Sequence, residues 1–227
     1  INGFKNANFS VSSVKQSPLS KKPSPPFTTS TLQQEASRKL GFNVSRTMQA
    51  AQKLYESGHI TYMRTDSVTL SETALSSIQK TVKSEFGEKY SKTRNFSNKN
   101  KNAQQAHEAV RPTKFSNNVL NIDSDQSNLY DLIWKRTVAS QMSDALVDKT
   151  IVKIDSDNHE GYFQSEGEVI RFDGFLKLYR ESKDDSPQNE EKNNILPSFS
   201  NGETIIKEKV YVTQSFSKSP FRYSEAS

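Results

Sequence analysis

The sequence contains no cysteine, so the chain can form no disulfide, no thiolate metal site and no cysteine nucleophile. It also lacks the run of about 18 apolar residues that a bilayer-spanning helix needs, and its mean hydropathy is −0.80. The lack of such a run excludes a membrane-spanning helix. The three histidines, at positions 59, 107 and 159, are scattered along the chain, so no zinc site is predicted.

Sequence motifs for nucleotide and ester hydrolysis are missing as well. The chain has no G-x-x-x-x-G-K-[ST] phosphate loop, no G-x-G-x-x-G, no G-x-S-x-G and no H-E-x-x-H. Two D-x-D pairs occur, at 123–125 and 155–157, but such pairs are more typical of solvated turns than of metal sites. We therefore assign no metal ligand in this chain.

Charge is unevenly distributed around a net value of +5. Residues 1–100 carry 15 basic and 6 acidic side chains, a balance of +9, whereas residues 151–200 carry 6 basic and 11 acidic ones, a balance of −5. The basic half would attract a polyanion, because Lys and Arg release the counterions condensed on nucleic-acid phosphates. Charge alone permits a nucleic-acid partner without requiring one.

The first residues, Ile1–Phe4, include neither an initiator methionine nor the basic-then-apolar order of a signal peptide. We therefore expect the sequence to be a piece of a longer chain.

Apolar residues at helical spacing, bounded by capping residues and glycines, predict four helices. The first follows the hydroxyl-rich segment Thr28–Ser30 and ends at Gly41, and the second begins at a Ser45 cap and ends at Gly58. The third runs from 71 to Gly87, and the fourth, of about 15–20 residues, is centred on 129–138. Residues 88–104 are polar, and we expect a mobile loop around 98–102.

Period-two patterns predict strands at both ends of the chain. One lies within 5–14; after Lys149 others follow at 151–156, 169–172 and 205–212, with a charged insertion at 181–194. Between them, the four prolines of 17–26 favour an extended linker, with neither helix nor central strand. The predicted class is α+β and multidomain: a helical domain at 23–148 inserted in a mostly β domain made of 1–22 and 149–227.

Two segments concentrate chemically active side chains. Residues 58–67 place a phenol, a guanidinium, a carboxylate and several hydroxyls after a helix end, although spacing alone favours a strand end with a surface tyrosine and an Arg–Asp ion pair. Residues 103–113 contain His107 and Arg111, which would share one face of a helical turn ended by Pro112. The alternative is a capped surface turn with Glu108 in solvent.

Three segments, Pro26–Ala36, Ile60–Ser67 and Ala106–Pro112, together resemble the bacterial type IA DNA topoisomerases. They occur in the order found in that family and at plausible distances. Residues 171–175 and 220–226 also resemble parts of the family's β domain, so the resemblance covers essentially the whole chain.

The resemblance implies a fragment of an enzyme that cleaves one DNA strand, passes a strand through the break and reseals it, relaxing negatively supercoiled DNA without ATP. Tyr62 matches the tyrosine that forms a 5′-phosphotyrosine bond, and Arg64 matches the arginine that stabilises the charge developing on phosphate. His107 matches a histidine near the scissile phosphate, and Arg111 would support it by ion pairing. These are the expected catalytic residues, Tyr62, Arg64 and His107.

The resemblance also implies DNA contacts by Phe42, Arg64, Thr65, Asp66 and Arg111. Phe42 would stack on a base, or it is simply an aromatic of the helical hairpin core. Asp66 would orient Arg64 or a neighbour rather than act as a base. The Mg²⁺ of the family is expected on an acidic domain outside this chain, with no metal ligand or other cofactor within it.

The implied partners are single-stranded segments of DNA and the metal-binding and DNA-gripping domains of a parent chain in the bacterial cytoplasm, with no membrane. The helical domain would be a moving jaw with hinges near Lys21–Pro26 and Ser143–Lys149, and the isolated fragment is expected to be inactive. Without the resemblance, a non-catalytic DNA-binding module or a protein-interaction domain stays open.

Overall fold

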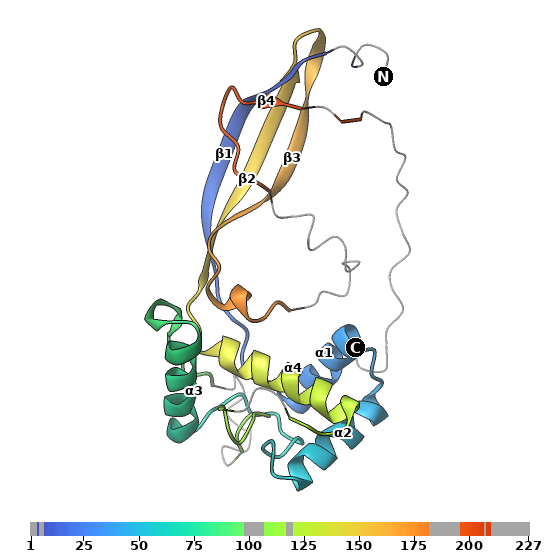
Figure 1. Cartoon of the computed structure of the whole chain (residues 1–227), viewed down its shortest axis with the longest axis vertical. Helices are drawn as coiled ribbons and strands as arrows, with labels where there is room; N and C mark the ends of the chain where they lie inside the picture. The colour runs from blue at the N-terminus through green and yellow to red at the C-terminus, as the bar shows by residue number, and fades with distance from the viewer. Residues whose placement is uncertain are drawn as a thin grey trace. The chain divides into compact units, whose positions relative to one another are not determined.

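The computed structural model describes residues 4, 7–97, 107–116, 120–181, 196–206, 208 and 209. Its contacts divide the chain into two units, which Figure 1 shows as a sheet and a group of helices. The sheet unit takes the described parts of 1–21, 146–173 and 185–221, and the helical unit takes those of 22–145 and 174–184. The predicted α+β class is confirmed. Within the described ranges, no helix is long and apolar enough to span a membrane.

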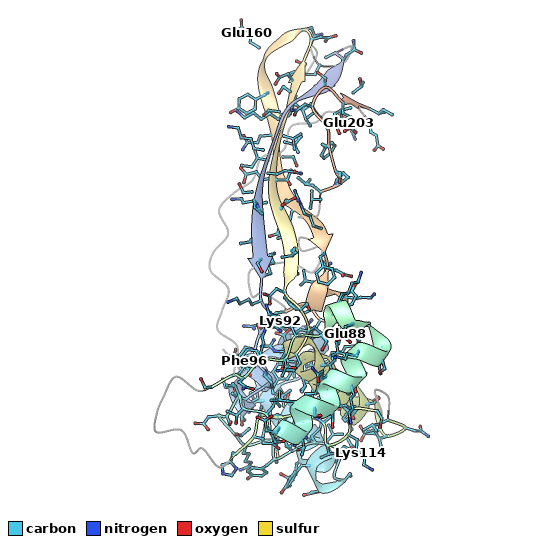
Figure 2. All side chains as sticks on the ribbon, turned by 90° about the vertical axis from the view of Figure 1, so that its left-hand side faces the viewer. Glu88, Lys92, Phe96, Lys114, Glu160 and Glu203 are labelled. Atoms are coloured by element: carbon cyan, nitrogen blue, oxygen red, sulfur yellow. The ribbon has the colours of Figure 1, made fainter. Side chains whose placement is uncertain are left out.

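The sheet has four antiparallel strands in the order β3-β2-β1-β4. They are β1 (Phe9–Lys21), β2 (Ala145–Ser156), β3 (His159–Phe172) and β4 (Thr204–Ile205). The first strand of the chain therefore lies between two strands that follow the helices. In Figure 2, Glu160 and Glu203 both lie at the end of the sheet that carries the β2–β3 turn. The predicted strand at 169–172 is only the end of the 14-residue β3, and the predicted strand at 205–212 is confirmed only at Ile205, with 207 and 210–212 outside the described residues.

The prediction of a linker over 17–26 was wrong for 17–21, because β1 continues through Pro18 to Lys21. The described part of β4 pairs only with Phe9 and Ser10 of β1. Beyond Ser10, β1 has β2 as its neighbour on one side and no described part of β4 on the other. A proline, which has no N–H, is therefore tolerated there as it is on an edge strand. The irregular linker therefore begins only after Lys21.

The four predicted helices are confirmed as α1 (Thr29–Leu40), α2 (Val44–Glu56), α3 (Glu72–Glu85) and α4 (Ser124–Ser140). The N-cap of α2 is Asn43, whose side chain accepts from the Arg46 N–H, and the prediction of Ser45 as its cap was wrong. Asp123 caps α4 by accepting from the Asp125 and Gln126 N–H groups. The first D-x-D pair is thus a helix start.

The core of the helical unit is formed where α4 packs against α1, α2 and α3. Burying each large apolar side chain contributes about 1.5–3 kcal/mol. The largest fully buried apolar side chains there are Phe27, Leu32, Leu54, Ile60, Met63, Ile78, Leu129, Ile133 and Met142. Two of them, Ile60 and Met63, belong to the irregular segment after α2, so that segment is anchored in the core.

Residues 88–97 follow α3, and most of their side chains are exposed, in line with their polar composition. They begin with the short helix η2 (Glu88–Tyr90), whose Tyr90 is buried. Lys92 and Arg94 both pair with Asp144, just before β2. The loop expected at 98–102 lies outside the described residues.

Residues 174–181 belong to the helical unit although they follow β3. They begin with η3 (Gly174–Lys177), and the Tyr179 hydroxyl donates to buried Glu35 of α1 at 2.9 Å. Arg136 of α4 binds Glu181 at 2.8 Å and the Pro25 carbonyl at 2.7 Å. This buried arginine therefore joins α4 both to the segment before α1, at Pro25, and to the segment after η3, at Glu181.

Candidate nucleic-acid site

The segment Ile60–Ser67 follows α2 as irregular backbone with bends at 61, 63 and 64. Its side chains alternate: Ile60, Met63, Thr65 and Ser67 are buried, whereas Tyr62, Arg64 and Asp66 are exposed. Because the residues between them are anchored in the core, Tyr62, Arg64 and Asp66 are left to solvent. The loop thus displays a phenol, a guanidinium and a carboxylate at the surface.

Residues 107–113 hold this segment from one side. The Thr61 N–H donates to the Arg111 carbonyl at 2.9 Å, and the Thr61 hydroxyl donates to the Ala109 carbonyl at 2.7 Å. Isolated bridges also join Ile60 to Pro112 and Phe27 to Val110. The two motif segments predicted from sequence therefore lie side by side.

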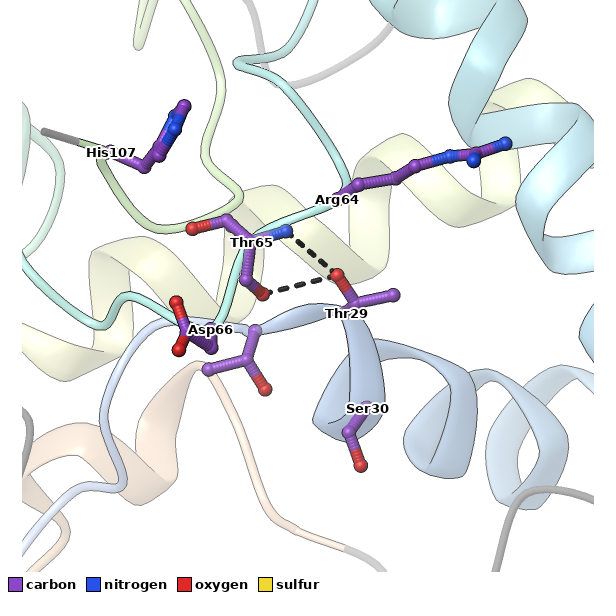
Figure 3. A pocket seen from close by; sticks show the side chains of 7 residues that line it. Thr29, Ser30, Arg64, Thr65, Asp66 and His107 are labelled. Atoms are coloured by element: carbon purple, nitrogen blue, oxygen red, sulfur yellow. Dashed lines mark hydrogen bonds between the residues drawn. The ribbon is translucent and has the colours of Figure 1, made fainter. Parts of the chain in front are cut away.

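A pocket of about 470 Å³ lies beside the loop at the start of α1. Its lining residues are Thr28, Thr29, Ser30, Arg64, Thr65, Asp66 and His107 (Figure 3). The start of α1 contributes the positive end of a helix dipole, Arg64 a fixed cation and His107 an imidazole. These groups, with several hydroxyls and a single carboxylate, suit a phosphate-sized anion.

Tyr62 is 41% exposed and does not line this pocket. Its ring makes an edge contact with Tyr55, at the end of α2, with ring centroids 5.2 Å apart. Tyr55 is also 41% exposed. Sequence analysis assigned Tyr55 no role beyond membership of the helix that ends at Gly58. Its position three residues before that glycine, close to the segment with Tyr62, was the only sequence feature that could have indicated a place at the site.

His107 is exposed and lines the pocket, but residues 107–109 are not helical. The prediction that Arg111 would support His107 on one helical face was wrong, because Arg111 binds Glu108 at 2.5 Å. Glu108 also accepts from the Ser71 N–H at 2.6 Å, so it is not simply solvated. Burial raises the pKa of Glu108, but the hydrogen bonds from Arg111 and Ser71 outweigh it and leave the pKa below its ordinary value.

Asp66 and Arg64 both line the pocket, but Figure 3 shows their side chains pointing apart. In the described ranges no hydrogen bond or ion pair joins them, so Asp66 does not orient Arg64 here, and its orienting a neighbour stays a prediction. Thr65 is buried, and its hydroxyl accepts from the Ser67 N–H at 3.0 Å. Thr65 therefore supports the loop from within.

Phe42 is only 4% exposed, and the Arg46 guanidinium lies 4.2 Å from its ring centroid. A base cannot stack on a ring that is covered in this way. The hairpin-core alternative for Phe42 is the one that its burial supports, and the expectation of base stacking was wrong for this conformation.

Within the described parts of the chain, no group of three or more His, Asp or Glu side chains could hold a metal ion. The carboxylate at the pocket, Asp66, therefore has no acidic partners there. The residues described do not fit a Mg²⁺ site.

The sequence profile of the DNA topoisomerase family matches residues 1–227. The chain is 46% identical to DNA topoisomerase 1 of Zymomonas mobilis over 225 residues, covering 97% of this chain and 18% of that protein. It is 47% identical to DNA topoisomerase 1 of Streptomyces coelicolor over 233 residues, covering 99% of this chain and 24% of that protein. The chain thus spans between about a fifth and a third of such relatives.

A solved structure is also similar, that of full-length topoisomerase I from Thermotoga maritima. The similarity has a TM-score of 0.65 at 34% identity and covers 88% of this chain and 33% of that one.

Proposed function

Because this chain belongs to the bacterial type IA DNA topoisomerase I family, we propose that Tyr62 is the nucleophile of a strand-cleavage reaction on single-stranded DNA. The Tyr62 phenolic oxygen attacks a backbone phosphorus, the bond from phosphorus to the 3′ oxygen breaks, and that oxygen leaves as a 3′-hydroxyl after taking up a proton. The 5′-phosphate stays esterified to Tyr62. Attack by the 3′-hydroxyl on this ester reverses the step and reseals the strand without ATP.

The observation that carries the proposal is the exposure of Tyr62 and Arg64 on a loop whose alternate residues are anchored in the core. A phenol has an ordinary pKa of about 10, so its attack at neutral pH needs positive charge near the developing phenolate and phosphorane. Arg64 supplies a forked guanidinium that can hold two phosphate oxygens. His107 contributes an imidazole and the start of α1 the positive end of its helix dipole around the same pocket.

Thr65, Asp66 and Arg111 act on the DNA side in different ways. Asp66 lines the pocket and limits how much negative charge enters it, whereas Thr65 and Arg111 keep the loop and its neighbour in place. As the resemblance implies, the family's Mg²⁺ would sit on acidic residues outside this chain, and the described residues include no group of three His, Asp or Glu side chains that could hold it. Every step assigned to this chain is therefore one of attack, orientation or charge stabilisation by its own groups.

In the whole enzyme we propose that the helical unit is the jaw that opens for strand passage, so that the enzyme relaxes negatively supercoiled DNA in the bacterial cytoplasm. The borders between the units, after Lys21 and after Ala145, support hinges near 21–26 and 143–149. A reversible crosslink between the two units should leave cleavage intact and stop strand passage. Unimpaired relaxation by the crosslinked enzyme would contradict the jaw.

The test of cleavage uses a chimera in which this chain replaces the matching segment of the Zymomonas mobilis enzyme. A single-stranded oligonucleotide is labelled at its 3′ end or at its 5′ end, and protein–DNA adducts are separated under denaturing conditions. A 5′-phosphotyrosine predicts a labelled adduct only from the 3′-labelled strand, and a shortened free product from the 5′-labelled one. The isolated chain should give no adduct and no plasmid relaxation.

Tyr62→Phe should abolish the adduct in the chimera. Tyr162→Phe is the matched control, because Tyr162 is another exposed tyrosine but belongs to β3. An adduct that survives Tyr62→Phe would refute Tyr62 as nucleophile. DNA binding by a folded chimera that forms no adduct would favour the non-catalytic DNA-binding module.

A further inference from the structure

Thr29 makes an unusual set of hydrogen bonds to the loop that carries Tyr62 and Arg64. Its backbone N–H donates to the Thr65 carbonyl at 2.8 Å. Its hydroxyl donates toward the Met63 and Thr65 carbonyls, at 2.8 and 3.0 Å, and accepts from the Thr65 N–H at 2.8 Å. Figure 3 shows the hydrogen bonds between the Thr29 hydroxyl and Thr65 as dashed lines.

These bonds hold the peptide groups on both sides of Arg64. The Met63 carbonyl belongs to the peptide before Arg64, and the Thr65 N–H belongs to the peptide after it. Fixing both peptides fixes the direction in which the Arg64 side chain leaves the backbone. One hydroxyl on α1 therefore fixes the point and the direction from which the Arg64 side chain extends.

The hydroxyl of Thr29 is not needed to begin its own helix. Thr28 is the N-cap of α1, and it forms a reciprocal capping box with Thr31. Thr29, the first residue of the helix, is thus free to bind the loop instead. Sequence analysis could not separate these roles, because Thr28, Thr29 and Thr31 are all equally good capping residues by type.

We propose that Thr29 is a positioning residue for strand cleavage: through the backbone of Met63 and Thr65 it sets the position of Arg64, and thereby of the phosphate that Tyr62 attacks. This role rests on the proposed function of Tyr62. Displacement of a positioned group by about 1 Å can cost about 100-fold in rate. The effect is expected on the rate of the chemical step rather than on DNA affinity, because Thr29 releases no counterion.

The test compares Thr29→Val, which keeps the shape but loses the hydroxyl, with Thr29→Ser, which keeps the hydroxyl. Both are made in the chimera, and adduct formation is measured with saturating 3′-labelled oligonucleotide alongside the Kd for the same strand. We expect Thr29→Val to slow adduct formation by about 10- to 100-fold with a Kd within about twofold of the parent. Thr29→Ser should restore the rate to within about threefold.

Thr31→Val is the matched control, because it removes a hydroxyl from the same helix turn without touching the loop. It should lower the melting temperature about as much as Thr29→Val but leave the adduct rate unchanged. The positioning role is refuted if Thr29→Val keeps the parental rate, if Thr29→Ser is as slow as Thr29→Val, or if Thr31→Val is equally slow. A folded parental chimera that gives no adduct refutes the proposed function, and the positioning role with it.

Discussion

The Glu108–Arg111 pair lies in the segment that holds the loop through Thr61, and its removal should have a large effect on stability. Arg111 is only 13% exposed, and its guanidinium donates to Glu108 and to the Pro112 carbonyl, while its Nε is buried and unpaired. Glu108→Ala would remove the anion and the acceptor for the Ser71 N–H, leaving the charge of Arg111 without its partner. Losing two hydrogen bonds, one of them charge-assisted, should cost about 2–3 kcal/mol.

Thermal unfolding of the chain gives the measurement. A loss of about 2–3 kcal/mol lowers the melting temperature by about 4–12 °C for a chain of this size. Glu88→Ala is the matched control, because Glu88 is highly exposed and its pair with Lys83 should change stability by no more than about 0.5 kcal/mol. The double variant Glu108→Ala/Arg111→Met should be less destabilised than the sum of its single variants, since no unpaired charge is left behind.

The same pair predicts a pH dependence. The pKa of Glu108 is lower in the folded protein than its ordinary value, so its contribution to stability is present above that ordinary value and is lost as the pH falls through the folded pKa. Glu108→Gln should therefore weaken the fall of melting temperature with acid in this range. Equal melting temperatures of Glu108→Ala and Glu88→Ala at neutral pH would refute the assigned role of the pair.

Three further changes test other parts of the structure. Arg136→Met should destabilise by about 1–3 kcal/mol and speed amide exchange in 174–181, because it removes the bonds to Glu181 and Pro25; unchanged exchange would contradict this. Gly174→Ala should lower the free energy of unfolding by about 2–5 kcal/mol, since φ is +49° and a Cβ would lie 2.6 Å from the Ser143 carbonyl oxygen. Gly58→Ala is the control: its φ is +72° but a Cβ would meet open space, so the loss measured by thermal unfolding should be only about 1–2 kcal/mol. Tyr55→Ala should slow adduct formation about 3- to 10-fold, because the ring contact with Tyr62 is worth about 0.5–1.5 kcal/mol, whereas Tyr55→Phe keeps the ring and should not slow it. A Tyr55→Ala rate equal to the parental rate would show that Tyr55 does not act at the site.

Patterns within a few residues of each other were enough to predict the helices. Apolar spacing, the hydroxyls before α1 and Gly41 after it are local signals, because helix hydrogen bonds and caps join residues three or four apart. The alternation of Ile60–Ser67 is equally local. Three short motifs were likewise sufficient to indicate the family, which the comparisons confirm.

Contacts between residues far apart in sequence decided the rest. The path of β1 through Pro18 depends on which of its edges is paired, and the partner of Arg111 depends on an extended rather than helical backbone. Phe42 is covered by Arg46 and the hairpin core, and no spacing rule distinguishes that environment from an exposed one.

The site itself shows the same division. Sequence by itself determined which side chains are available, a phenol, a guanidinium and an imidazole in two short motifs. Only the tertiary structure brought the first turn of α1 against Thr65 and made Thr29, rather than its neighbouring threonines, the residue bound to the loop. The physical reason is that a hydroxyl has the same bonding capacity at each of these positions, and the fold alone decides which acceptor lies within reach.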